Sequence, residues 1–121
     1  MTDNVKNTRI FYNPNCTKCR LSLQLLNEKG IEPEIIEYLT DTPDFAAIEN
    51  ILDLLGIGPR ELMRTHEKEY EALDLGRSEI SRHDLIQAMI DNPVLIERPI
   101  VIKDGKATIG RPPEKILDLL S

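Results

Sequence analysis

The chain is poor in cysteine and in long apolar runs. Only two of its 121 residues are cysteine, so a scaffold held by disulfides is excluded and the reducing cytoplasm is the expected compartment. No apolar run approaches the ~20 residues that cross a membrane. Residues 1–7 are polar and lack the apolar stretch of a secretory signal. We therefore expect a cytoplasmic protein that does not contact a membrane.

Positive charge and histidine are also scarce. The chain has 15 Lys and Arg residues and 21 Asp and Glu residues, which gives a net charge of −6. Nucleic-acid binding, in contrast, requires a basic surface. The two histidines, His66 and His83, lie far along the chain from the cysteines, with no spacing typical of a zinc site. We expect neither a nucleic-acid partner nor a bound metal. The length suits one domain, and nothing in the sequence indicates an obligate dimer, so we expect a monomer.

Both cysteines lie in a single Cys-x-x-Cys motif, formed by Cys16 and Cys19. The apolar, β-branched residues 9–12 before the motif predict a strand, and leucines at helical spacing follow it. Cys16 is therefore expected at a helix N-terminus, where free backbone N–H groups and the helix dipole stabilise an anion. Such a position lowers the pKa of a thiol and makes its thiolate a nucleophile.

The order of predicted elements indicates an α/β fold. Residues 8–39 predict a βαβ unit, residues 42–92 several helices, and residues 99–120 two strands followed by a helix. Asp104-Gly105 is a strong hairpin signal between the last two strands, and Thr42 is the expected N-cap of the first helix in the middle segment. The result is a single thioredoxin-like domain, with a mixed four-stranded sheet, helices packed on it and a helical insertion in the middle.

Three arginines occur near element boundaries in separate segments: Arg64, Arg98 and Arg111. Arginine is permanently charged, and its planar fork of donors matches a tetrahedral oxyanion. A thiolate beside several arginines would suit nucleophilic attack on an oxyanion centre. Taken singly, each arginine is more often a solvated surface charge, and the sequence alone does not show that they converge.

Four segments, spread over residues 10–120, together resemble the glutaredoxin-coupled arsenate reductases: Tyr12-Asn13-Pro14-Asn15-Cys16, Arg60-Glu61-Leu62-Met63-Arg64, residues 92–101 with Glu97-Arg98-Pro99, and Ile109-Gly110-Arg111-Pro112-Pro113-Glu114. The resemblance implies a thioredoxin-like fold and one nucleophilic cysteine, Cys16. It implies an oxyanion-binding triad of Arg64, Arg98 and Arg111, and a cis peptide at Pro99.

The same resemblance implies the reaction. Cys16 attacks arsenate, glutathione attacks the adduct as a co-substrate, and glutaredoxin resolves the mixed disulfide as arsenite leaves. Electrons come from thiols, so no bound cofactor is expected. Asn13 and the backbone N–H groups of the loop are additional candidate oxyanion donors.

Two positions depart from the family pattern. Tyr12 stands where many members carry a histidine that helps to hold the cysteine as thiolate, which leaves activation to the helix terminus, the arginines and Lys18. Cys19 stands where well-known members carry serine. It is either a resolving thiol that closes a disulfide with Cys16 or a small apolar residue on the buried helix face.

Two other functions remain open. One is a transcriptional regulator of the Spx type, which shares the fold and the Cys-x-x-Cys but acts by binding RNA polymerase. The other is a general thiol-disulfide oxidoreductase that uses Cys16 and Cys19. Neither of these functions uses the three arginines.

Overall fold

The computed structural model describes residues 8–120, so the polar segment 1–7 lies outside the described residues. The chain divides into two compact units. One, the sheet unit, contains the residues up to Asp41 together with those from Arg98 onward. The other, the helical unit, is Thr42–Glu97. The expected insertion at residues 42–92 falls within the helical unit.

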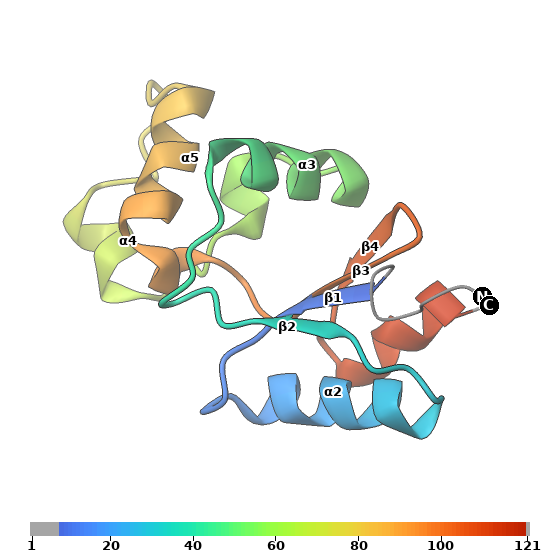
Figure 1. The fold of residues 1–121 in the computed structure, drawn as a ribbon. Helices are drawn as coiled ribbons and strands as arrows, with labels where there is room; N and C mark the ends of the chain where they lie inside the picture. The colour runs from blue at the N-terminus through green and yellow to red at the C-terminus, as the bar shows by residue number, and fades with distance from the viewer. Residues whose placement is uncertain (1–7, 121) are drawn as a thin grey trace. The chain divides into compact units, whose positions relative to one another are not determined.

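The sheet unit is built on a mixed four-stranded sheet with the order β2-β1-β3-β4 (Figure 1). β1 pairs in parallel with β2 and antiparallel with β3, and β3 pairs antiparallel with β4. Asp104 and Gly105 join β3 to β4 with φ values of 51° and 79°, the left-handed backbone that a tight hairpin turn requires. This is the predicted thioredoxin-like sheet. Its strands are β1 (Thr8–Phe11), β2 (Glu34–Ile36), β3 (Ile100–Lys103) and β4 (Lys106–Ile109).

β2 is shorter than the strand expected over residues 34–39. It ends at Ile36, and the carbonyl of Glu37 then accepts hydrogen bonds from the backbone N–H groups of Thr40 and Asp41. These bonds form a turn, which takes the backbone away from the sheet. Tyr38 is completely buried within this turn.

One face of the sheet is covered by α2 (Thr17–Glu28) and by a 3-10 helix, η3 (Pro113–Leu120), which pack against each other. Their shared core is the buried cluster of Ile10, Leu26, Ile31, Val101 and Ile116. This packing fixes α2 on β1 and thereby fixes the loop between them, which carries Cys16.

The last predicted helix is present and is of the 3-10 type. With three residues per turn, a 3-10 helix aligns every third side chain along one edge. Pro113 and Ile116 are buried on that edge, and Leu119 packs against the core cluster. The 3-10 form therefore presents these three side chains to the sheet unit in one row.

The helical unit contains two longer α-helices, α3 and α5, which contact each other. Asp44, rather than the expected Thr42, is the N-cap of α3, because its carboxylate accepts a hydrogen bond of 2.8 Å from the backbone N–H of Ala47. Ser81 caps α5, because its hydroxyl accepts a hydrogen bond of 3.1 Å from the backbone N–H of Asp84. The elements of the unit are α3 (Phe45–Leu55), η1 (Pro59–Leu62), α4 (Lys68–Ala72), α5 (Arg82–Asp91) and η2 (Pro93–Leu95).

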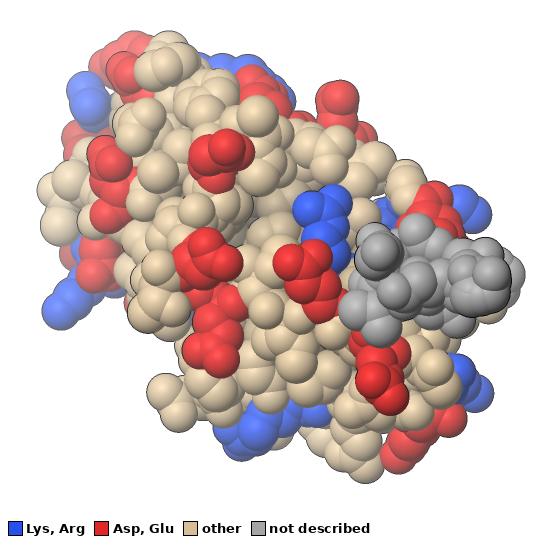
Figure 2. Space-filling model, viewed as in Figure 1, with Lys and Arg blue, Asp and Glu red and all other residues tan. Residues whose placement is uncertain are grey.

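On the face drawn in Figure 2, Asp and Glu side chains are scattered among uncharged residues, and Lys and Arg occur in small separate groups. An anionic substrate would therefore need a local cluster of cations. Among residues 8–120, no helix has the length and hydropathy that a membrane crossing requires.

Candidate functional site

The loop between β1 and α2 positions the first cysteine. Cys16 is the N-cap of α2, with an extended backbone (φ −104°, ψ 121°), and its N–H donates to the carbonyl of Asn13 over 3.0 Å. The side-chain oxygen of Asn13 accepts a bond of 2.9 Å from the N–H of Asn15. These bonds tighten the loop and set Cys16 at the positive end of the helix, as the sequence predicted.

The environment of Cys16 favours its thiolate. The residue is 7% exposed. Burial alone would raise the pKa of the thiol, but hydrogen bonding from the Arg98 side chain, interactions with the Cys19 backbone N–H and thiol, and the charge of Arg98 outweigh it. The pKa of Cys16 is lowered from 9.0 to about 7. Lys18, which the sequence offered as a contributor, is exposed and is not among these groups.

Cys19 has the opposite character. It lies in the first turn of α2 with no exposed surface. Burial is the main reason that its pKa rises to about 12; the Asn13 backbone N–H opposes this rise, and the neighbouring Cys16 adds to it. The Asn13 nitrogen lies 3.5 Å from the Cys19 sulfur. Cys19 is therefore a protonated thiol beside an ionisable one.

Arg98 and Arg111 lie together at the start of β3. The Nε atom of Arg111 donates to the Arg98 carbonyl over 2.7 Å. The Arg98–Pro99 peptide bond is cis, the isomer that the resemblance implied, and the Arg111–Pro112 bond is also cis, which the sequence did not indicate. The sheet unit thus brings Cys16, Arg98 and Arg111 into one connected set of contacts.

Gly110 allows the segments around this site to approach closely. A Cβ atom at this position would lie 2.6 Å from Ser22 Oγ and 2.9 Å from Pro99 Cγ, distances that side chains do not tolerate. The Gly110 N–H also donates to the Pro99 carbonyl over 2.9 Å. Gly110 therefore fixes the cis-proline segment against α2.

Arg64 lies in the helical unit, and acidic side chains engage its guanidinium. Its Nε atom is 2.9 Å from Glu67 Oε2, and its Nη1 atom is 3.0 Å from Glu97 Oε1. The third nitrogen, Nη2, lies 3.1 Å from Nε2 of His66. The Arg64 side chain is only 10% exposed. Arg64, which the sequence offered as an oxyanion ligand, is therefore mostly buried and forms ion pairs with Glu67 and Glu97.

The sequence reasoning missed the acidic partners of Arg64. Glu67 lies three residues after Arg64, and Glu97 directly precedes Arg98, so a local ion pair could have been suspected for Glu67 but not for the distant Glu97. The sequence also did not indicate that the buried Tyr38 interacts electrostatically with Arg98. The side-chain oxygen of Asn13 holds the loop, and its side-chain NH₂ is the group that can donate to an oxyanion.

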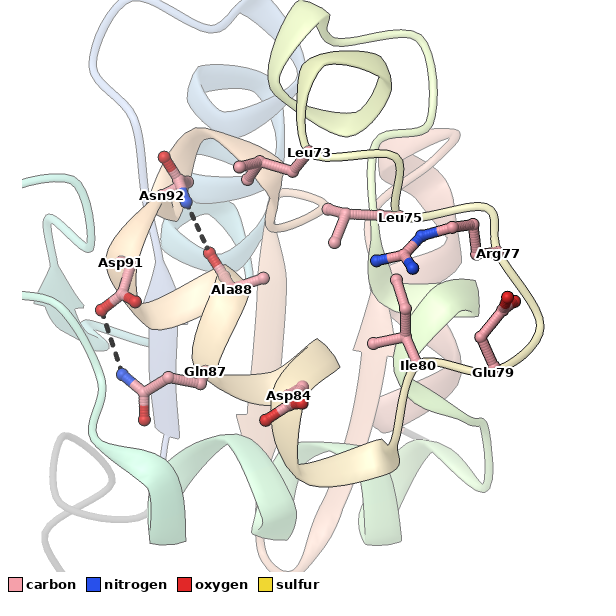
Figure 3. A pocket seen from close by; sticks show the side chains of 10 residues that line it. All are labelled: Leu73, Leu75, Arg77, Glu79, Ile80, Asp84, Gln87, Ala88, Asp91 and Asn92. Carbon is pink, nitrogen blue, oxygen red and sulfur yellow. Dashed lines mark hydrogen bonds between the residues drawn. The ribbon is translucent and has the colours of Figure 1, made fainter.

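A separate pocket lies in the helical unit (Figure 3). It has a volume of about 480 Å³ and combines buried Leu75 with the carboxylates of Glu79, Asp84 and Asp91. None of the candidate site residues lines it. In the part of the chain that the structure describes, no group of three or more His, Cys, Asp or Glu side chains is arranged to hold a metal ion.

Comparison with known proteins finds relatives that match nearly the whole described chain. A family model described as the ArsC family matches residues 11–119. The uncharacterized protein YfgD of Escherichia coli K12 is 49% identical over 116 residues, which cover 95% of this chain and 98% of that protein. An arsenate reductase of Neisseria meningitidis serogroup A is 41% identical over 109 residues, which cover 89% and 93%.

A solved structure gives the same result. The arsenate reductase from Vibrio cholerae superposes with a TM-score of 0.90 at 42% identity and covers 92% of this chain and 95% of that one. The family match spans nearly the whole described chain, including both cysteines, Arg98 and Arg111. The protein therefore belongs to the ArsC family.

Proposed function

We propose that the protein is an arsenate reductase that uses the Cys16 thiolate as its nucleophile and thiols as its source of electrons. The observation that carries the proposal is the contact between Cys16 and Arg98, which supports a thiolate near neutral pH beside a permanent cation. Relatives named arsenate reductases, in Neisseria meningitidis and Vibrio cholerae, support the substrate.

The first step is the attack of Cys16 on arsenic. A sulfur–arsenic bond forms, and one arsenate oxygen takes up protons and leaves as water. Arg98 and Arg111 neutralise the remaining oxygens, and donors placed in advance stabilise the developing charge more effectively than water would. When the thiolate becomes bonded to arsenic, it loses the charge that Arg98 had balanced. That guanidinium then becomes available to the oxyanion.

The second stage supplies two electrons. Glutathione attacks the adduct, glutaredoxin removes glutathione as a mixed disulfide, and arsenic leaves as arsenite. In total, one arsenate and two glutathione molecules give arsenite, glutathione disulfide and water. Glutathione is thus a co-substrate, glutaredoxin a partner, and no bound cofactor takes part. We further propose that the protein works in the cytoplasm as a monomer, where glutathione keeps Cys16 and Cys19 reduced.

Arg64 requires a rearrangement to join this site. Because two carboxylates and one imidazole occupy its guanidinium, it must release Glu67 or Glu97 before it can bind an oxyanion with a bidentate fork. We assign oxyanion binding first to Arg98 and Arg111. Arg64 joins them only after Glu67 or Glu97 has moved away from its guanidinium.

The test is an arsenate-dependent assay of NADPH oxidation, coupled through glutathione, glutaredoxin and glutathione reductase. Wild-type protein should be active, and Cys16→Ser should be inactive. Arg98→Lys keeps the charge but loses the fork, so its kcat/KM for arsenate should fall by about tenfold or more, as expected for a lost charge-assisted hydrogen bond. Arg82→Lys is the matched control, because Arg82 forms an exposed ion pair with Glu49 in the helical unit.

Full activity in Cys16→Ser would refute the mechanism. Inactive wild-type protein with either glutaredoxin or thioredoxin would refute arsenate as a substrate. In that case, retention of RNA polymerase on the immobilised protein would favour the regulatory function instead.

A further inference from the structure

Cys16 and Cys19 occupy the N-cap and the third residue of the same helix. Residues three apart in a helix have Cα atoms about 5 Å apart, which lies within the 4.4–6.8 Å range that disulfides span. Both cysteines are free thiols in this structure. The backbone therefore permits a disulfide between them without a change in the course of the helix.

The two sulfurs also interact directly. Each cysteine changes the ionisation of the other through a side-chain hydrogen bond. Cys16 retains a small exposed surface of 7% and is the more readily ionised thiol, whereas Cys19 is fully buried and keeps its proton. This asymmetry separates an attacking thiol from a resolving thiol, because thiol–disulfide exchange requires a thiolate that can reach the disulfide.

We propose that the protein has a second, arsenate-independent activity, in which it exchanges thiols with small disulfides, with Cys16 attacking and Cys19 resolving. With glutathione disulfide, the Cys16 thiolate attacks one sulfur, forms a Cys16–glutathione disulfide and releases one glutathione. Cys19 then attacks the Cys16 sulfur, loses its proton to solvent and releases the second glutathione. The protein dithiol is oxidised to a Cys16–Cys19 disulfide, and one glutathione disulfide is reduced to two glutathione molecules.

The high pKa of Cys19 does not block the second step, because part of its cause disappears in the first step. The charge of Cys16 and its hydrogen bond both raise the pKa of Cys19, and both are lost when Cys16 is bonded to glutathione. The positive charge of Arg98, which lowers the pKa of Cys19, is then no longer shared with a Cys16 thiolate. The Asn13 N–H, 3.5 Å from the Cys19 sulfur, remains to stabilise the new anion.

This activity has a consequence for the arsenate site. A Cys16–Cys19 disulfide removes the nucleophile and protects it from further oxidation. A dithiol reductant would restore it by the reverse exchange. The same pair would therefore link arsenate reduction to the ratio of glutathione disulfide to glutathione.

The experiment treats the reduced full-length protein with glutathione disulfide in the absence of arsenate. Samples are quenched with acid, alkylated under denaturing conditions and analysed by intact mass spectrometry. Wild-type protein should pass through a short-lived glutathione adduct and end as an internal disulfide with no free thiol. Cys19→Ser and Cys19→Ala should both retain the adduct on Cys16 and release glutathione at least about tenfold more slowly, since no internal thiol can displace it.

Two controls complete the design. Ser22→Ala removes another small, buried polar group from the same helix and should behave as wild type. Cys16→Ser should not react, because Cys19 is buried. A wild-type adduct as long-lived as that of Cys19→Ser would overturn the proposal. Since no arsenate is present, this result would leave the proposed reductase function untouched, and loss of arsenate activity would likewise not affect this test.

Discussion

Replacement of Arg98 by methionine should raise the pKa of Cys16. In the wild type, donors from Arg98 and Cys19 outweigh burial and bring the pKa from 9.0 to about 7. Arg98→Met removes both the hydrogen bond and the charge of the guanidinium but keeps a side chain of similar length. Only the Cys19 donors then oppose burial, so the pKa should rise from about 7 toward 9.0.

The size of the effect follows from the fraction of thiolate. At pH 7 a thiol with a pKa of about 7 is half ionised, whereas one with a pKa of 9.0 is about 1% ionised. The intrinsic nucleophilicity of a thiolate rises with its pKa, with a Brønsted coefficient of about 0.4–0.5. A rise of the pKa by about two therefore makes each thiolate roughly six- to tenfold more reactive, which partly offsets the loss of thiolate. If the pKa returns fully to 9.0, alkylation at pH 7 should therefore be about five- to eightfold slower. At about pH 10 the order should reverse, because both thiols are ionised and the variant is the stronger nucleophile.

The assay is the rate of iodoacetamide alkylation of Cys16 as a function of pH, with the modified peptide identified by mass spectrometry. Iodoacetamide is uncharged, so loss of the guanidinium does not change its attraction to the site. Arg98→Lys should give an intermediate midpoint, and Arg82→Met should match the wild type. An unchanged midpoint in Arg98→Met would refute the role of Arg98, and a wild-type midpoint near 9 would refute thiolate stabilisation altogether.

Three further changes test the packing and the charges. Gly110→Ala should destabilise the protein by about 1–3 kcal/mol in urea unfolding, because its methyl group would overlap the Ser22 hydroxyl; Gly58→Ala, which meets only ordinary contacts, is the control. Asp44→Ala should cost about 1 kcal/mol in the same measurement, since it removes the N-cap of α3. The stability of the wild type relative to Cys16→Ser should increase between pH 7 and pH 9, because the folded pKa is lowered from 9.0 to about 7 and the stabilisation is lost as the pH falls through the folded value.

Local patterns were sufficient to predict much of the sheet unit. The position of Cys16 followed from an apolar strand joined to a helical repeat, and the β3–β4 hairpin followed from Asp104-Gly105, whose backbone is left-handed at both residues. These features depend on neighbours in sequence. The prediction of Thr42 as an N-cap was wrong for a related reason: Thr42 and Asp44 flank Pro43 and are both good capping residues, and only the bond to Ala47 selects Asp44.

Contacts between distant segments were not predictable in the same way. Nothing local indicates that Gly110 must leave room for Ser22, or that the Arg111 side chain donates to the Arg98 carbonyl. Both depend on the packing of η3 and β4 against the rest of the sheet unit. The motif around Arg98 and Pro99 identified the segment, but its contact with Cys16 required the fold.

The three arginines look alike in the sequence and differ in their partners. Arg98 balances a thiolate, Arg111 donates to a backbone carbonyl, and Arg64 faces the carboxylates of Glu67 and Glu97. Since two carboxylates face its one guanidinium, Arg64 can bind an oxyanion only after it has released Glu67 or Glu97. In the proposed reaction, the negative charge of the thiolate passes to the substrate oxygens when Cys16 bonds to arsenic, so the Arg98 guanidinium that had balanced the thiolate can then stabilise the oxyanion. The proposed attack by Cys16 thus moves negative charge from a sulfur that Arg98 contacts onto the oxygens of the substrate, where a fixed cation stabilises the developing charge.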